Sequence, residues 1–204
     1  MKIIGLTGPS GAGKSTLCAQ FEAYGIPCIN TDEIYHNLTS YSSPCTLELK
    51  EKFGEGILNE NGSLNRAALA EIVFKSEDSK EKIASLNTTA HKYIWDETNK
   101  LLTQYIDEGK RAAVIDAPVL FSSKIFIGAC DFIVSVLCDS KTRLERILQR
   151  DSITDEQAIA RMNAQPSDEF FIENSDYYIT NDGTLEDMNA QLVTILSQEG
   201  IYVE

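Results

Sequence analysis

Short apolar runs recur along the chain, and segments whose apolar positions follow a helical period separate them. Strands that alternate with helices in this way indicate an α/β fold with a parallel sheet. In such folds, ligands bind at the carboxyl ends of the strands. We therefore expect a ligand site at the edge that carries Gly8, Asp32, Asp116 and Asp139. The predicted strands are Lys2–Leu6, Pro27–Asn30, Ala112–Asp116, Phe132–Leu137 and Tyr177–Thr180.

The long interval between the second and third strands breaks this alternation, because several helical segments follow one another there. An insertion at a ligand-binding edge more often forms a substrate lobe than structural padding, and we favour the lobe. Its helices are predicted from capping and terminating residues. One helix begins at Ser43-Pro44 and ends at Gly54, and a second covers Arg66–Phe74 after an Asn65 cap. A third begins near Ser76, and a fourth covers about His91–Glu108 before Gly109.

A second and shorter insertion carries a group of arginines. Lys141–Arg150 is predicted to be a helix that places Arg143, Arg146 and Arg150 on one face, which we call the arginine face. Thr154 followed by Gln157 is a capping-box signal for the next helix. The arginine face either closes on phosphates as a mobile lid or is a solvated surface paired with carboxylates. We favour a phosphate role for Arg146 or Arg150. The carboxylates available for pairing are Glu145, Asp151 and Asp155.

Residues Gly8–Thr16 have the pattern G-x-x-x-x-G-K-[ST] between a predicted strand and a predicted helix, which is the setting that a phosphate-binding loop requires. Gly11 and Gly13, with Ala12 between them, let backbone N–H groups curl around phosphate oxygens. Lys14 can reach the β- and γ-phosphates. Ser15, which precedes Thr16, can ligate Mg²⁺. The alternative, a chance glycine-rich turn, does not explain why strand, loop and helix are in register.

Two carboxylates at the same edge are candidates for chemistry. Asp32 lies just past the second strand, where it can accept or orient the proton of a hydroxyl nucleophile. Its alternative role is the N-cap of a helix that begins near Glu33. Asp116 ends the third strand and is a candidate for water-mediated contact with Mg²⁺, or for a hydrogen bond to the loop helix. His36 and His91 are single histidines on predicted helices, and such residues are more often packed or on the surface than catalytic.

The composition excludes several classes of partner. The formal net charge of −13 argues against nucleic acid but not against a nucleotide, which needs only a local positive pocket. No apolar run approaches membrane-spanning length, and the chain opens with a strand instead of a signal peptide. The five cysteines are widely spaced without a CxxC pair, which is typical of a reducing cytosol, and with two histidines they do not suggest a zinc site. We expect a cytoplasmic protein.

Taken in order, these segments resemble the dephospho-coenzyme A kinase family nearly from end to end. Only the phosphate-binding loop is specific by itself; the shared order and spacing of the other segments carry the resemblance. The matching segments are Gly8–Thr16, Gly25–Ile34, Gly62–Leu69 with Val73-Phe74, His91–Ile94, Asp116–Phe121, Leu144–Asp151, Arg161–Gln165 and Ser175–Gly183.

The resemblance implies a P-loop NTPase three-layer sandwich with a five-stranded parallel sheet, a helical lobe for the acceptor and a short helical lid. It implies transfer of a phosphoryl group from ATP, with Mg²⁺, to the ribose 3′-hydroxyl of dephospho-CoA, the last step of CoA biosynthesis. The implied subregions of this single domain are a nucleotide-binding core at 1–34, 110–139 and 166–204, an acceptor lobe at 35–109 and a lid at 140–165.

The same resemblance implies roles for individual residues. Asp32 would be the catalytic base, acting with Lys14 and Arg146. Ser15 and Asp116 would hold the metal ion. Acceptor binding would involve Asp32, His91 and Arg66. The implied ATP-binding residues are Gly11, Ala12, Gly13, Lys14, Ser15, Thr16, Arg146, Arg150 and Asn181.

The chain departs from the family pattern at several positions, so the acceptor contacts, or the acceptor itself, can differ. Another small-metabolite or nucleoside kinase, similar to uridine kinases, is therefore the second hypothesis. A GTPase switch or a non-catalytic nucleotide-binding protein is less favoured, because Asn99-Lys100 does not continue into a guanine motif and both Lys14 and Asp32 are present. A monomer or small homo-oligomer is expected. The departures are Pro9-Ser10 for Gly-Ile, Asn30 for Asp, Tyr35-His36 for Ala-Arg, Lys92 for Pro and Ser122 for Glu.

Overall fold

The computed structural model describes residues 1–75 and 78–203, and the chain divides into two compact units. Residues 1–29 and 103–204 form one of them, which we call the loop unit because it contains the phosphate-binding loop. Residues 30–102 form the other, the helical unit. The helix start predicted near Ser76 lies outside the described residues.

A single five-stranded sheet has the order β2-β3-β1-β4-β5, and the prediction of five parallel strands is confirmed. β1 pairs in parallel with β3 and β4, and β4 pairs in parallel with β5. This order puts β1, which leads into the phosphate-binding loop, in the middle of the sheet. The strands are β1 (Lys2–Thr7), β2 (Cys28–Asn30), β3 (Ala112–Asp116), β4 (Phe132–Leu137) and β5 (Tyr177–Thr180).

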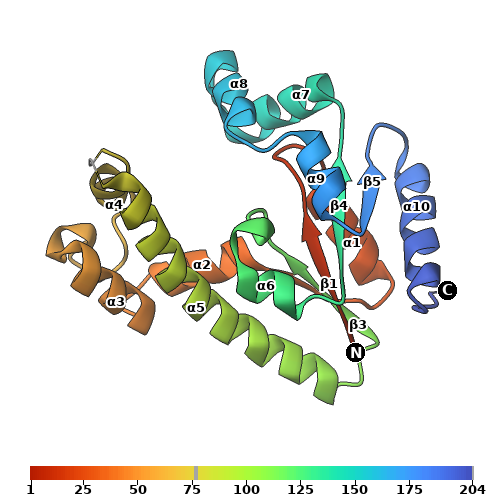
Figure 1. Ribbon diagram of the computed structural model, residues 1–204, viewed down its shortest axis with the longest axis horizontal. Helices are drawn as coiled ribbons and strands as arrows, with labels where there is room; N and C mark the ends of the chain where they lie inside the picture. Colours follow the sequence, from red (N-terminus) through yellow and green to blue (C-terminus); the bar gives the residue numbers. More distant parts are fainter. Residues whose placement is uncertain (76–77, 204) are drawn as a thin grey trace. The chain divides into compact units, whose positions relative to one another are not determined.

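One face of this sheet packs against α1 (Lys14–Ala23) and α10 (Leu185–Gln198) (Figure 1). The apolar side chains of these helices join those of β1 and β4 in one buried cluster. Alternate residues of a strand point to opposite faces, so Ile4 and Leu6 belong to this cluster and Gly5 faces the other side. There a Cβ on Gly5 would lie 2.9 Å from Cys130 Sγ. The elements near that face are η2 (Leu120–Ser122), α6 (Lys124–Ala129) and α9 (Asp168–Asn174).

The arginine face belongs to α7 (Ser140–Asp151), which is followed by α8 (Asp155–Asn163). The side chain of Asp139 accepts a hydrogen bond from Thr142 N and caps α7. Thr154 and Gln157 form the predicted capping box at the start of α8. α7 and α8 pack against each other, as Figure 1 shows.

The helical unit contains α2 (Thr31–Thr39), α3 (Pro44–Phe53), η1 (Glu55–Ile57), α4 (Arg66–Phe74) and most of α5 (Ser79–Asp107). The predicted bounds of α3 and α4 are confirmed, with Ser43 and Asn65 as N-caps. The prediction of two separate helices in the later segment is wrong, because α5 is one helix of 29 residues. Neither glycine nor proline interrupts residues 79–107, so nothing in the sequence ends a helix near His91.

Lys92 explains part of this continuity. It stands where the family pattern has proline, and it carries the backbone N–H that an uninterrupted helix needs. Its Nζ reaches Glu48 Oε2 on α3 at 2.9 Å, and Tyr93 Oη donates to the same oxygen at 2.8 Å. Lys52 pairs with Glu48 Oε1 at 2.9 Å. These partners, Lys92 foremost, lower the pKa of Glu48 to about 2 and tie α3 to α5.

Within the described part of the chain, no helix is both long enough and apolar enough to cross a lipid bilayer.

Candidate active site

The phosphate-binding loop has a backbone that requires glycine at defined positions. Gly8 has φ +139°, and a Cβ there would lie 2.3 Å from the backbone oxygen of Val136 on β4. Gly13 has φ +106°, and a Cβ there would lie 2.0 Å from Asn181 Nδ2. Side chains would clash at both positions, and L residues other than glycine rarely adopt these angles. The glycine spacing of the motif therefore follows from how closely the loop packs against β4 and the residue after β5.

The amino end of α1 is open to a ligand. Gly13 is its N-cap residue and supplies no side-chain hydrogen bond to the first turn, whereas Asn30, Ser43 and Asn65 cap their helices with side-chain oxygens. Ser15 and Thr16 are exposed in that first turn. An uncapped helix start presents backbone N–H groups and a partial positive charge, which together favour a phosphate group.

Lys14 and Arg146 bring two cations to the loop. Lys14 Nζ donates to Gly8 O at 2.8 Å. Arg146, half-buried on α7, donates through Nη1 to Gly11 O at 3.3 Å and to Ala12 O at 3.4 Å. Each cation thus contacts backbone carbonyl groups of the loop, which puts two positive charges beside it.

The other two members of the arginine face contact Ser10 at the tip of the loop. Arg150 Nη2 donates to Ser10 Oγ at 3.1 Å while its Nε pairs with Asp151 at 2.7 Å. Arg143 is buried and donates through Nε to Ser10 O at 3.2 Å. The alternative of a solvated face paired only with carboxylates is therefore wrong for Arg143 and Arg146, and Arg150 combines a carboxylate contact with a loop contact.

Gln165 was not among the predicted site residues, although it ends one of the segments that carry the family resemblance. Its Oε1 accepts hydrogen bonds from Ser10 N at 3.0 Å and from Arg143 Nη2 at 3.2 Å. Gln165 and Arg143 thus hold the tip of the loop. The arginine spacing was the only sequence signal for this contact, because the segment after α8 has no periodic pattern that points at the loop.

Asn181, which follows β5, contacts the loop through its side chain. It is buried, and its Nδ2 donates to Ala12 O at 2.8 Å. Its own backbone oxygen accepts from Arg146 Nη2 at 3.5 Å. The structure therefore places Asn181, Ala12 and Arg146 in mutual contact, and the side-chain amide of Asn181 fixes the loop conformation.

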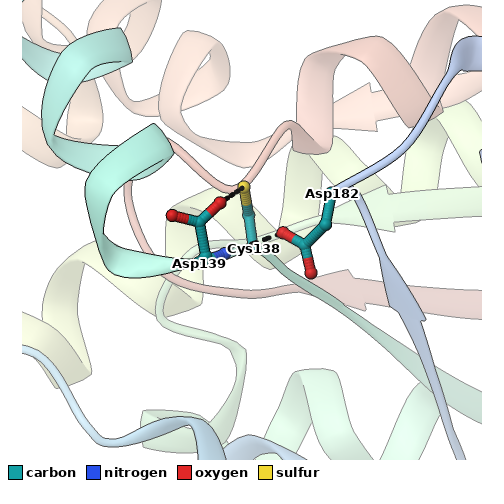
Figure 2. Close-up of side chains that lie close together, drawn as sticks. All are labelled: Cys138, Asp139 and Asp182. Carbon is teal, nitrogen blue, oxygen red and sulfur yellow. Dashed lines mark hydrogen bonds between the residues drawn. The ribbon is translucent and has the colours of Figure 1, made fainter.

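Cys138, Asp139 and Asp182 lie close together beside the loop and could hold a metal ion by their ligand types (Figure 2). Each already has a structural partner. Asp139 caps α7, and its backbone N–H donates to Asp182 Oδ1 at 2.8 Å. Thr142 lowers the pKa of Asp139, and burial raises the pKa of the Cys138 thiol to about 11. A protonated thiol is a poor metal ligand, so we interpret this cluster as the anchor of α7.

Asp116 is the predicted metal-contacting carboxylate, and it ends β3 as expected. It is 7% exposed, and the Cys18 thiol on α1 donates to its Oδ2 at 3.8 Å. The alternative role, a hydrogen bond to the loop helix, is therefore present in the structure. A hydroxyl and a carboxylate are ligand types that Mg²⁺ accepts, so Ser15 and Asp116 fit a magnesium site by their chemistry.

Asp32 lies in the first turn of α2, two residues after the end of β2, and its side chain is exposed. The alternative that Asp32 caps this helix is wrong. Asn30 is the N-cap, and its Oδ1 accepts from Glu33 N at 3.0 Å. The asparagine that departs from the family pattern thus has a local structural role, and the Asp32 carboxylate is not needed for capping.

The helical unit contains a small pocket around Arg66. Its volume is about 250 Å³, and we call it the Arg66 pocket; it is lined by His36, Thr39, Ser40, Ser63, Leu64 and Arg66. His91, the other predicted acceptor-binding residue besides Asp32, lies on α5 and does not line it. Burial lowers the pKa of His91, which favours a neutral imidazole. The structure therefore does not bring His91 and Arg66 together in this pocket.

Solved structures with the same fold include two with informative similarity. A crystal structure of a Thermus thermophilus protein is 27% identical and superposes with a TM-score of 0.77, covering 97% of each chain. Shikimate kinase from Acinetobacter baumannii is 18% identical, with a TM-score of 0.53 over 98% of this chain and 95% of that one. The second similarity shows the fold alone.

Sequence comparison extends over almost the whole chain. The dephospho-CoA kinase family model matches residues 2–187. A dephospho-CoA kinase of Bacillus cereus is 37% identical over 199 residues, or 98% of each chain. One from Corynebacterium glutamicum is 32% identical over 195 residues, or 96% of each. With the phosphate-binding loop and its arginines in place, these matches show that the chain belongs to the dephospho-CoA kinase family.

Proposed function

We propose that this protein transfers the γ-phosphoryl group of ATP to the ribose 3′-hydroxyl of dephospho-CoA, giving CoA and ADP. The observation that carries the proposal is the placement of Lys14 and Arg146 on the carbonyl groups of one phosphate-binding loop, in a chain whose family match runs from residue 2 to 187. Phosphoryl transfer needs positioned phosphates, charge neutralisation and an oriented nucleophile more than covalent help from the protein.

On the nucleotide side, the loop amides and the open end of α1 bind the β- and γ-phosphates of ATP. Lys14 and Arg146 exchange their contacts with loop carbonyls for contacts with phosphate oxygens, and Arg150 does the same from Ser10. Asn181 maintains the loop conformation through Ala12 and lies beside the nucleotide. These contacts neutralise the negative charge that develops as the γ-phosphoryl group moves.

Ser15 and Asp116 would hold Mg²⁺. The Ser15 hydroxyl is exposed at the start of α1, and the Asp116 carboxylate ends the strand next to β1. The ion, when bound, supplies positive charge to the phosphate oxygens. The protein's own contribution is to orient these two oxygen ligands, with the Cys18 thiol holding the carboxylate of Asp116 in place.

On the acceptor side, Asp32 is the general base. An exposed carboxylate in the first turn of α2 can accept the proton of the ribose hydroxyl as the oxygen attacks phosphorus. We assign acceptor binding to residues 35–109, with Arg66 and His91 as contacts. We also place the protein in the cytoplasm, as a monomer or small homo-oligomer, and its five cysteines are free thiols as expected in a reducing compartment.

Phosphorylation of another small metabolite is the second candidate, because the shikimate kinase fold similarity shows that the same architecture serves other acceptors. A coupled assay of ADP release separates the two. It compares dephospho-CoA, adenosine, uridine, shikimate and a reaction without acceptor. Dephospho-CoA should give turnover well above the blank. If it gives no more ADP than the blank while another acceptor does, the assignment fails.

A further inference from the structure

The helical unit contains one arginine, Arg66, and this arginine is not paired with an acid. Among residues 1–75 and 78–203, no carboxylate forms an ion pair with it. By contrast, most lysines of the helical unit pair with a nearby carboxylate, as expected in a chain with a net charge of −13. The paired lysines are Lys50, Lys52, Lys75, Lys82, Lys92 and Lys100.

Neutral groups hold the Arg66 guanidinium in place. Its Cζ lies 5.3 Å from the centroid of the Tyr35 ring, which is a cation–π distance. Its Nη2 donates to Thr39 Oγ1 at 3.1 Å, and that buried hydroxyl donates in turn to Tyr35 O at 2.7 Å. Its Nη2 also lies 3.4 Å from His36 Nδ1. These contacts orient an exposed guanidinium that no carboxylate of the described residues neutralises.

These contacts leave donors available. Within the described part of the chain, only Nη2 of Arg66 has protein acceptors, so the Nε and Nη1 hydrogens can donate to a ligand. Because a guanidinium only donates, the His36 Nδ1 that faces it must be the acceptor, and the neutral ring carries its proton on Nε2. The imidazole thus adds a second donor to the same pocket.

The Arg66 pocket is large enough for a single chemical group but too small for a whole metabolite. Its volume is about 250 Å³, whereas sites for complete small molecules run from roughly 300 to 1,000 Å³. Ser40 and Ser63 also line it, but their hydroxyls already donate to Asn37 O at 2.8 Å and to Asn61 Oδ1 at 2.6 Å. Arg66 and His36 line it together, and an unneutralised guanidinium beside an imidazole matches the oxygens of a phosphate or diphosphate.

We propose that the Arg66 pocket binds the diphosphate of the acceptor, and that Arg66 with His36 selects acceptors that carry this group. The inference rests on the proposed function, because dephospho-CoA carries a diphosphate between its ribose and its pantetheine arm. Arg66 then acts as a binding and specificity residue and takes no part in the chemical step.

A titration followed by NMR tests the pocket without turnover. The chain has two histidines, so the imidazole resonances of His36 and His91 can be followed separately, and His36→Gln identifies the first. The phosphate-binding loop is first saturated with ADP, and inorganic pyrophosphate is then added, with inorganic phosphate and adenosine in parallel titrations. We expect pyrophosphate to shift the His36 resonance in a saturable way and adenosine to leave it unchanged.

Variants at Arg66 sharpen this readout. Arg66→Ala should abolish the pyrophosphate-dependent shift, and Arg66→Lys should weaken it, because lysine keeps the charge but loses the planar donor arrangement. Lys75→Ala, which removes an exposed cation at the other end of α4, should leave the shift intact. A His36 resonance that does not respond in the wild-type protein, or responds equally in Arg66→Ala, overturns the proposal whatever the state of the variants' folding.

Kinetics separate this inference from the proposed function. Arg66→Ala should lower kcat/KM for dephospho-CoA about 10- to 100-fold, the usual effect of losing a charged hydrogen-bond donor, and should leave kcat/KM for adenosine unchanged. An equal fall in kcat/KM for dephospho-CoA and for adenosine overturns the proposal. If dephospho-CoA is not phosphorylated but pyrophosphate still shifts His36 through Arg66, the proposed function fails while the anion site stands.

Discussion

The two units place their cations in different ways. In the loop unit, Lys14 donates to Gly8 O, six residues away within the nine-residue loop Gly8–Thr16, so the motif itself determines where this charge lies. Arg146 reaches the carbonyls of the same loop from α7, 135 residues away. In the helical unit, Arg66 is positioned by side chains of α2, more than 25 residues away in sequence: the Thr39 contact spans 27 residues and the His36 contact 30. A backbone-defined site can be recognised from a short pattern, whereas a side-chain-defined site depends on tertiary packing.

The largest effect should come from Asp32, the proposed base contributed by the helical unit. Asp32→Asn is expected to lower kcat by at least ~10²-fold with little change in ATP affinity, because the amide cannot accept the hydroxyl proton but leaves the loop untouched. Steady-state ADP release with dephospho-CoA, together with a nucleotide-binding titration, measures both quantities.

Glu33→Gln is the matched control for this substitution. Glu33 is the adjacent exposed carboxylate in the same first turn of α2, so its change removes the same charge from the same helix end. Its kcat should stay within a few-fold of wild type. Near-wild-type turnover in Asp32→Asn would remove Asp32 from the chemistry and leave it as an acidic residue that only favours the helix dipole.

The loop unit should show the next largest effect, through Arg146. Arg146→Ala should lower kcat/KM for ATP about 10- to 100-fold, because a charge-assisted contact to phosphate is lost. Arg161→Ala removes the same charge from α8, where the residue pairs with Asp151, and should change kcat/KM little. Equal effects of the two substitutions would mean that Arg146 acts through general electrostatics instead of direct phosphate contact.

The sequence predicts the features of each unit that local signals specify, and it does not predict those that depend on tertiary contacts. The five strands, α3, α4 and the phosphate-binding loop could be predicted because local signals specify them: apolar runs, caps such as Ser43 and Asn65, and the glycine spacing of the loop. The contacts of Gln165 and Asn181 with the loop could not be predicted in this way. They join residues more than 150 positions apart, and no local pattern reports such a pairing.

The wrong prediction for α5 concerns a segment in which one residue departs from the family pattern. Separate helices are expected from about Ser76 and over about His91–Glu108, although this chain has Lys92 where the family pattern has proline. The helix continues, and the lysine side chain finds Glu48 on α3. The contact between Lys92 and Glu48 joins residues 44 positions apart, and no local pattern predicts it.

The smallest expected effect tests that contact. The cationic partners of Glu48 hold its pKa at about 2, below the usual value of 4.5, so the charged form stabilises the folded state above pH 4.5. This stabilisation should disappear as the pH falls from 4.5 toward 2. The side chain is 23% exposed, so the contribution should stay below about 1 kcal/mol. Urea unfolding followed by fluorescence of Trp95, the single tryptophan and part of the helical unit, measures it.

Glu48→Gln should therefore be less stable than wild type at pH 7, and the difference should shrink toward zero near pH 2. Glu51→Gln, a change at an exposed carboxylate on the same helix, should show no such pH-dependent difference. A stability difference for Glu48→Gln that persists unchanged at pH 2 would show that the neutral hydrogen bond with Tyr93, and not the ion pairs with Lys52 and Lys92, ties α3 to α5. The helical unit would then depend on neutral contacts at this junction too, as it does around Arg66.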